Sequence, residues 1–207
     1  MPLRNRVDPF GDILAVGERG TMMGNRGGRI HDPASKRILR RWTSKAWICC
    51  LLHYKDQHHE PMGKGYTSLF FLDEVTALAA GHRPCFYCRR RDAKDFLSRL
   101  GGDIRAPAFD RIAHSDRLDG KHRKRTFRAR IDELPDGAMV ALKGRPHAVG
   151  SNLLLPWSFS GYGAPVPKGG MGEIEVLTPR VFVAILAAGY RPGWHASAGL
   201  PQSGTSS

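Results

Sequence analysis

The chain has 207 residues, of which 41% are hydrophobic and 25% are charged, a balance that allows a folded core and excludes a disordered polyelectrolyte. Its 32 lysines and arginines outnumber its 19 acidic residues, and the resulting net charge of +13 favours a polyanionic partner. Four cysteines are too few for a disulfide scaffold, and the neighbours Cys49 and Cys50 could bond each other only with strain.

The N-terminal residues lack the apolar stretch of a signal peptide. The longest apolar runs, at 46–52 and 181–188, are far shorter than a bilayer span. We therefore expect a soluble, cytoplasmic protein with no membrane partner. In that compartment thiols stay reduced, so a Cys-x-x-Cys sequence indicates metal or redox chemistry.

Composition and periodicity predict an α+β fold, in which a small module of short strands and helices precedes a β-rich region and a C-terminal helix. The expected organisation is a Gly/Arg-rich segment at 1–45, the small module at 46–100, which contains all four cysteines, a basic linker and helix at 101–130, the β-rich region at 131–196 and a disordered tail at 197–207.

The first feature in chain order is the segment Gly24–Asp32, where the run Asn-Arg-Gly-Gly has the composition of a turn. The interpretation that we favour is a structural loop leading into a strand. The alternative is a phosphate cradle, in which exposed backbone N–H groups bind the anion beside Arg26 and Arg29.

Two apolar, β-prone runs at 47–52 and 66–72 each predict a short strand, with a polar loop between them. Asp73 then caps a helix whose apolar stripe includes Val75 and Leu78. Gly81 ends this helix as its C′ residue, and Pro84 prevents the helix from resuming.

Three further helices are predicted from apolar periodicity and end signals. They are Asp92–Leu100, Phe109–Leu118 and a final helix that Thr178 and Pro179 open and Gly189 ends. Strand patterns at 138–142, 147–149, 152–158 and 173–177 precede the final helix.

Cys85 and Cys88 follow Pro84 on a tight turn, where both thiolates can point at one tetrahedral zinc ion. Neighbours in a strand face opposite sides, so we expect one of Cys49 and Cys50 to be a ligand and the other a small core residue. The predicted metal set is Cys50, Cys85 and Cys88, completed by Cys49 or His58. Further histidine candidates are His31, His59 and His82. A redox dithiol and plain cysteines without metal are the alternatives.

The segment Leu78–Cys85 has an echo at Leu186–Gly193, since both read Leu-Ala-Ala-Gly, one aromatic or histidine residue, then Arg-Pro. The second copy carries no cysteine. The shared pattern therefore indicates a common way to stop a helix, or a distant duplication, and only the cysteines themselves indicate zinc.

The stretch Leu69–Arg89 resembles the second half of the metal-binding domain of the Ada DNA-repair proteins. In that family an apolar strand, an alanine-rich helix, Gly-Tyr/Phe-Arg-Pro and Cys-x-x-Cys follow in the same order. The resemblance implies a small α/β zinc module that sits on DNA, with Cys85 and Cys88 in the positions of the last two of four cysteine ligands.

The first half of the family's pattern is different here. In the family two cysteines are separated by three residues, and the first accepts a methyl group from a phosphotriester. In this chain Cys49 directly precedes Cys50, so the acceptor role is not carried over to any residue. What the resemblance implies is zinc and DNA association.

Basic side chains gather beside the cysteine turn and in the run at 120–130, where they could follow a phosphate backbone. The residues that we expect to contact nucleic acid are Arg83, Arg89, Arg90, Arg91, Lys121, Arg123, Lys124 and Arg125. For the 120–130 run the alternative is a solvated helix face.

The sequence thus predicts a zinc-stabilised nucleic-acid-binding protein, with DNA as the expected partner and a link to repair. One alternative is an enzyme acting on nucleic acid, such as a nuclease or an alkyl-transfer protein. The other is a structural zinc module for protein interaction. No recognised catalytic spacing is present, so no catalytic residue is assigned.

Overall fold

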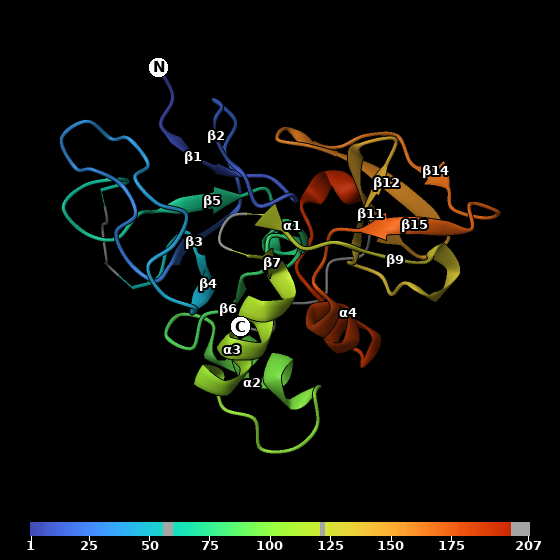
Figure 1. The fold of residues 1–207 in the computed structure, drawn as a ribbon. Coiled ribbons are helices and arrows are strands. Elements are labelled where there is room, and N and C mark those ends of the chain that lie inside the picture. The colour runs from blue at the N-terminus through green and yellow to red at the C-terminus, as the bar shows by residue number, and fades with distance from the viewer. Residues whose placement is uncertain (56–59, 121–122, 200–207) are drawn as a thin grey trace.

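The computed structural model describes residues 1–55, 60–120 and 123–199 (Figure 1). It has two large sheets with helix α1 between them and helices α2, α3 and α4 grouped at one end (Figure 1). The predicted α+β class is confirmed. No helix in the described part of the chain is long and apolar enough to cross a membrane.

The first sheet has six strands in the order β2-β1-β5-β3-β4-β6. The strands are β1 (Arg4–Val7), β2 (Ile13–Ala15), β3 (Met22–Arg26), β4 (Trp47–Leu51), β5 (Leu69–Phe71) and β6 (Arg83–Pro84). β1 pairs with β5 in parallel, and β4 pairs with β6 in parallel; the other pairings are antiparallel.

Alternation along β4 gives the first sheet two different faces. Trp47 and Cys49 are buried on the face that meets α1, and the neighbouring Ile48 is only half-buried. Because successive side chains of a strand point to opposite faces, Cys50 lies on the same face as Ile48. One sheet face therefore supplies core, and the other carries Cys50.

The second sheet contains the β-rich region predicted from the sequence and follows the order β13-β12-β11-β10-β15-β9, with β14 paired to β12. Its strands are β9 (Phe127–Arg130), β10 (Met139–Leu142), β11 (Arg145–Gly150), β12 (Leu153–Ser158), β13 (Gly161–Tyr162), β14 (Val166–Pro167) and β15 (Glu173–Val176). Two short strands, β7 (Leu118–Asp119) and β8 (Arg123–Lys124), pair with each other.

The four α-helices of the described residues match the sequence prediction in number and approximate position. They are α1 (Glu74–Ala79), α2 (Arg90–Ser98), α3 (Ala106–Arg117) and α4 (Arg180–Ala187). Asp73 caps α1 as predicted, its carboxylate accepting from the backbone N–H of Thr76 at 2.9 Å. Gly81 follows α1 at φ +81°, the left-handed conformation predicted for a C′ glycine.

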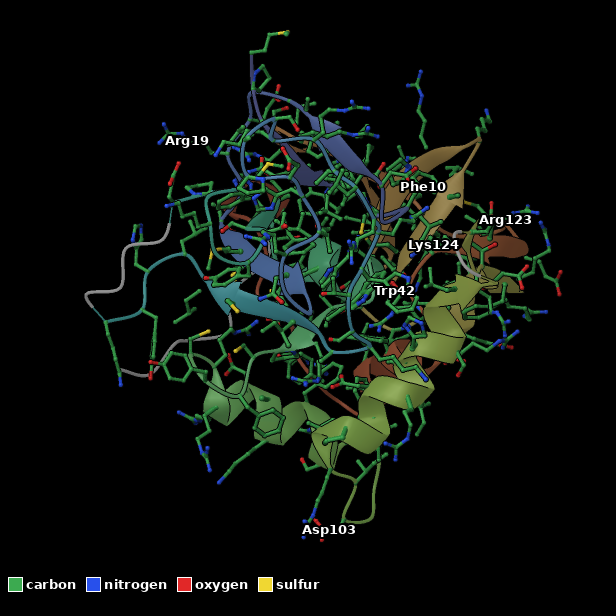
Figure 2. The ribbon with its side chains drawn as sticks, turned by 60° about the vertical axis from the view of Figure 1, so that its left-hand side comes forward. Phe10, Arg19, Trp42, Asp103, Arg123 and Lys124 are labelled. Carbon is green, nitrogen blue, oxygen red and sulfur yellow. The ribbon has the colours of Figure 1, made fainter. Side chains whose placement is uncertain are left out.

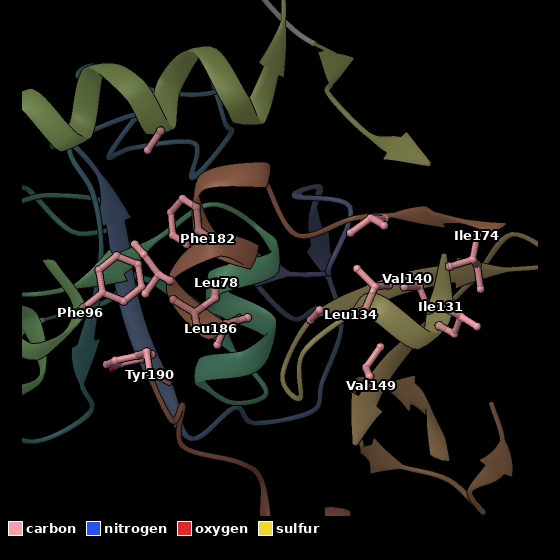
Figure 3. Packing of buried hydrophobic residues seen from close by; sticks show 14 of the residues in the cluster. Leu78, Phe96, Ile131, Leu134, Val140, Val149, Ile174, Phe182, Leu186 and Tyr190 are labelled. Carbon is pink, nitrogen blue, oxygen red and sulfur yellow. The ribbon is translucent and has the colours of Figure 1, made fainter. Parts of the chain in front are cut away.

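The largest core cluster joins helices to the second sheet. Phe182 and Leu186 of α4 lie beside Leu78 of α1 and Phe96 of α2, while Val140 and Ile174 come from the sheet (Figure 3). The rings of Phe96, Phe109, Phe182 and Tyr190 contact one another with centroids 5.0–5.6 Å apart. This cluster therefore fixes the four helices to the second sheet, while the buried residues of the first sheet form a separate cluster with Ala77 and Ala80.

The two carboxylates at the start of α1 bind the C-terminal region. The Oδ2 atom of Asp73 accepts from the Tyr162 hydroxyl at 2.8 Å and from the His195 N–H at 3.0 Å. Glu74 accepts from the Tyr190 hydroxyl at 2.7 Å and from the Gly193 N–H at 2.9 Å. Buried carboxylates need such donors, so the N-terminus of α1 is complete only with these residues in place.

These contacts group the chain differently from the division expected from composition. The segment 1–45 supplies β1, β2 and β3 to the sheet that contains β4 and β5, and the 101–130 stretch supplies β9 to the second sheet. Of the expected tail, residues 200–207 lie outside the described part, and Ala196–Ala198 form a short 3-10 turn.

Arg26, one cation of the alternative phosphate cradle, is fully buried, so its role in such a cradle is excluded. Its guanidinium lies 4.2 Å from the ring of Trp47, and that of Arg117 lies 4.0 Å from the same ring. Burial lowers the pKa of Arg26 to about 9. The Asn-Arg-Gly-Gly run ends β3 and turns away from it, rather than leading into a strand.

Candidate metal centre

Three of the four cysteines converge where β4 meets the turn after β6. The Sγ atoms of Cys50, Cys85 and Cys88 all lie within 4.8 Å of one another. Cys50 and Cys85 are buried, and Cys88 is half-buried. We refer to these residues as the three-thiol cluster, which can hold a metal ion.

Strand pairing explains why residues 35 positions apart meet. β6 runs parallel to β4, with Ile48 opposite Arg83 and Cys49 opposite Pro84. The N–H of Cys85 then donates to the carbonyl of Cys49 at 2.9 Å, extending the pairing by one residue. This register sets the turn of Cys85 and Cys88 against the end of β4.

Hydrogen bonds within the turn favour negative charge on sulfur. The N–H of Tyr87 donates to Cys85 Sγ at 3.3 Å. Hydrogen bonds with the thiols of Cys50 and then Cys88 lower the pKa of Cys85, and the reverse interactions together with burial raise the pKa of Cys50. The cluster therefore shares its protons, and a divalent cation bound by all three sulfurs would release them.

The dimensions and chemistry of the cluster fit a thiolate-binding metal. Sulfur atoms placed 2.3 Å from a tetrahedral ion are separated by about 3.8 Å, a spacing compatible with the observed grouping. Soft thiolate ligands select zinc, copper(I) or iron–sulfur chemistry over magnesium or calcium. An intact disulfide is not present among these cysteines.

The structure places Cys49 outside the three-thiol cluster, contrary to its prediction as a possible ligand, and of the two neighbouring cysteines only Cys50 belongs to the cluster. Cys49 is fully buried among core side chains, and its Sγ accepts from the Arg89 guanidinium at 3.8 Å. Burial raises the pKa of Cys49, which keeps the thiol neutral. Alternation on β4 turns it away from the face that displays Cys50.

Two histidine candidates for the fourth position have other partners. The ring nitrogens of His31 lie 2.6 Å from Thr67 Oγ1 and 2.9 Å from the carbonyl of Gly63. His82 is fully buried and accepts from the Arg26 guanidinium at 3.2 Å, so both are structural. His58 and His59 lie outside the described residues.

Three of the residues predicted to contact nucleic acid bind acceptors within the protein instead. Arg83 is buried, and its guanidinium binds Asp110 through two bonds of 2.8 and 2.9 Å. Arg89 is buried against Glu74 at 2.8 Å. Lys124 donates to the carbonyl of Ala79 at 2.6 Å.

These three predictions were wrong because buried acceptors on distant segments hold the cations away from any phosphate. The predicted residues that remain exposed are Arg90, Arg91, Arg123 and Arg125. Arg90 and Arg91 begin α2 directly after the three-thiol cluster. Arg123 lies on the far side of the molecule from Arg19 (Figure 2). Lys121 lies outside the described residues.

A large open pocket adjoins the three-thiol cluster, which forms part of its wall. The pocket has a volume of about 1190 Å³, and its floor is the sheet face that carries Ile48 and Cys50. Sequence reasoning missed this site because its side chains come from four strands, the N-terminal residues and three loops. The one available signal was alternation on β4, which assigned Cys50 to the face opposite the core.

A scan of protein-family models, a search of curated proteins and a search of solved structures found no match to this chain. The resemblance of Leu69–Arg89 to the Ada metal-binding domain therefore remains a prediction, supported only by the residues that carry it.

Proposed function

We propose that this protein is a zinc-stabilised nucleic-acid-binding protein, with DNA as the expected partner and a link to repair suggested by the Ada-like segment. The observation that carries the proposal is the convergence of Cys50, Cys85 and Cys88 within 4.8 Å. Thiolate sets of this kind are typical of structural zinc sites. His58, which lies outside the described residues, is the proposed fourth ligand.

Charge supports the nucleic-acid part of the proposal. The net charge is +13, and the exposed Arg90 and Arg91 directly follow the three-thiol cluster. An ion there would fix the turn and with it the start of α2. Phosphates of a polyanion would then meet these two cations with release of counterions.

Metal analysis of the purified protein tests the zinc component. We expect one zinc ion per chain in the wild type and in Cys49→Ser, and its loss in Cys50→Ser and Cys85→Ser. Cys49→Ser is a matched control, because it changes the adjacent thiol on the opposite sheet face. Equal zinc content in all four proteins, or no zinc in the wild type, would contradict the proposed site.

DNA binding tests the second component. The affinity of the zinc-loaded protein for duplex and single-stranded DNA is measured over a salt series. We expect affinity to fall steeply with salt, and the double variant Arg90→Ala/Arg91→Ala to reduce the log–log slope by roughly 2. Arg145→Ala, at the exposed start of β11, should leave the slope unchanged. Weak, salt-insensitive binding would leave a protein-interaction module as the better description.

A further inference from the structure

The face of the first sheet that carries Cys50 forms the floor of the pocket described above. Met23 from β3, Ile48 from β4 and Phe70 from β5 line it, and all three are half-buried. This face of the sheet is therefore an apolar surface, and one ligand of moderate size could cover it. Ligand pockets in proteins are mostly apolar with a few placed polar groups.

Aromatic rings surround this floor. Tyr54, Tyr66 and Tyr87 line the pocket together with Phe70. The rings of Tyr54 and Tyr87 meet edge to face with centroids 5.2 Å apart. The guanidinium of Arg6 lies 4.8 Å from the centroid of Phe70, so these two side chains already form a stack that a planar ring could extend.

The charge of the pocket has one sign. Arg6 and Arg19 line it, and none of the described residues that line it is acidic. Burial, then the nearby positive charge of Arg19, lowers the pKa of Arg6, and Glu18 partly offsets this effect. An anion between the two guanidiniums would add to the compensation that Glu18 provides. Arg19 is exposed at the molecular surface (Figure 2).

We propose that the pocket binds one nucleotide unit, with its unpaired base stacked on the Phe70–Arg6 pair and its phosphate held by Arg6 and Arg19. The unit comes from a single strand or from a free nucleotide, which share this chemistry. The inference rests in part on the proposed nucleic-acid function, since the strand is the source that function supplies. The bound nucleotide would lie against the wall that contains the three-thiol cluster.

Three probes distinguish the sources. A fluorescein-labelled 20-nucleotide single strand and its duplex are titrated by fluorescence anisotropy, and thymidine 5′-monophosphate by calorimetry. We expect Phe70→Ala to weaken binding of the strand or the mononucleotide about 10-fold. Arg19→Ala should weaken it several-fold and, with the strand, reduce the salt slope by about 1.

Each variant has a matched control on the second sheet. Phe127, like Phe70, is a half-buried strand residue with an arginine over its ring, the Arg180 guanidinium lying 4.0 Å from its centroid. Phe127→Ala and Arg145→Ala should bind as the wild type does. Thermal unfolding reports whether Phe70→Ala remains folded, and the exposed Arg19→Ala tests the pocket if it does not.

Binding of the strand alone identifies nucleic acid as the source, and binding of the mononucleotide alone identifies the free nucleotide. Duplex binding that neither Phe70→Ala nor Arg19→Ala alters, without a preference for the single strand or any uptake of mononucleotide, would overturn the pocket assignment and leave the proposed function standing. Failure to bind all three probes would overturn both.

Discussion

The segments Leu78–Cys85 and Leu186–Gly193 share a sequence pattern and a backbone conformation, but their structural roles differ. In both, a glycine at positive φ stops the helix, Gly81 at +81° and Gly189 at +98°. In both, the glycine N–H donates at 2.9 Å to the carbonyl of the residue three positions earlier. The N–H of the residue after the glycine donates to the carbonyl five positions before it. The shared residues therefore specify a helix stop.

The residues around each stop decide its use. The first copy continues into β6 and delivers Cys85 to the three-thiol cluster, whereas the second directs Tyr190 and the Gly193 N–H to Glu74 at the start of α1. A repeated motif thus indicates a repeated local structure. Its function follows from the distant partners that each copy meets.

The largest expected difference between the copies concerns their arginines. Arg83→Ala leaves the buried Asp110 carboxylate without its bidentate partner and should lower the free energy of unfolding by about 3–5 kcal/mol. Arg191 is exposed, so Arg191→Ala should change it by less than about 0.5 kcal/mol. Urea denaturation of both variants measures this, and equal effects would show that Arg83 is not tied into the core.

The two stop glycines should differ by a smaller amount. An alanine at either position must adopt positive φ, which costs about 1 kcal/mol. A Cβ at Gly81 would also lie 2.6 Å from Cδ of the buried Arg117, whereas at Gly189 it meets only the Arg99 guanidinium at 3.1 Å.

We therefore expect Gly81→Ala to cost roughly 3 kcal/mol and Gly189→Ala about 1 kcal/mol. Thermal unfolding with matched denaturant titrations provides both values. A larger loss at Gly189 would reverse our account of the packing around the two stops.

The smallest difference is one of pH dependence. A basic side chain donates to a carbonyl at the end of each helix, Lys124 to that of Ala79 and Arg99 to that of Ala188. Burial lowers the pKa of Lys124 to about 7, below the ordinary value of 10.5. Between these values the unfolded chain binds more protons than the folded protein, so stability rises with pH and is lost as pH falls towards 7.

Lys124→Met should flatten this rise, whose limiting slope is about 1.4 kcal/mol per pH unit. Arg99→Met should leave the slope intact, because arginine remains charged throughout that range. The measurement is the free energy of unfolding at several pH values between 7 and 10. If the free energy of unfolding of the wild type does not rise between pH 7 and 10, the Lys124 ammonium stays hydrated in the folded protein.

Local signals in the sequence were sufficient for the elements around the cluster. The Asp73 cap, the Gly81 stop and the Pro84 exit act through neighbours within a few residues, and the structure has each of them. Alternation on β4 was sufficient to predict that Cys49 and Cys50 separate, although not which distant thiols each would meet.

The failed predictions for the basic residues depend on partners remote in sequence. Arg83 and Arg89 resemble surface cations until Asp110 and Glu74 are placed beside them. The pocket beside Cys50 requires β1 to pair with β5 across more than sixty residues, which no local pattern encodes. Contacts between distant segments therefore explain why the burial of these arginines and the pocket could not be predicted from the sequence.

The acceptor roles of Asp73 and Glu74 also constrain the order in which the chain can fold. Their partners Tyr190, Gly193 and His195 leave the ribosome more than a hundred residues after α1 does. Until then two carboxylates at the helix start lack donors that the folded interior requires. The start of α1 thus gains all its donors only when the C-terminal residues are in place, so we expect the chain to fold as one unit.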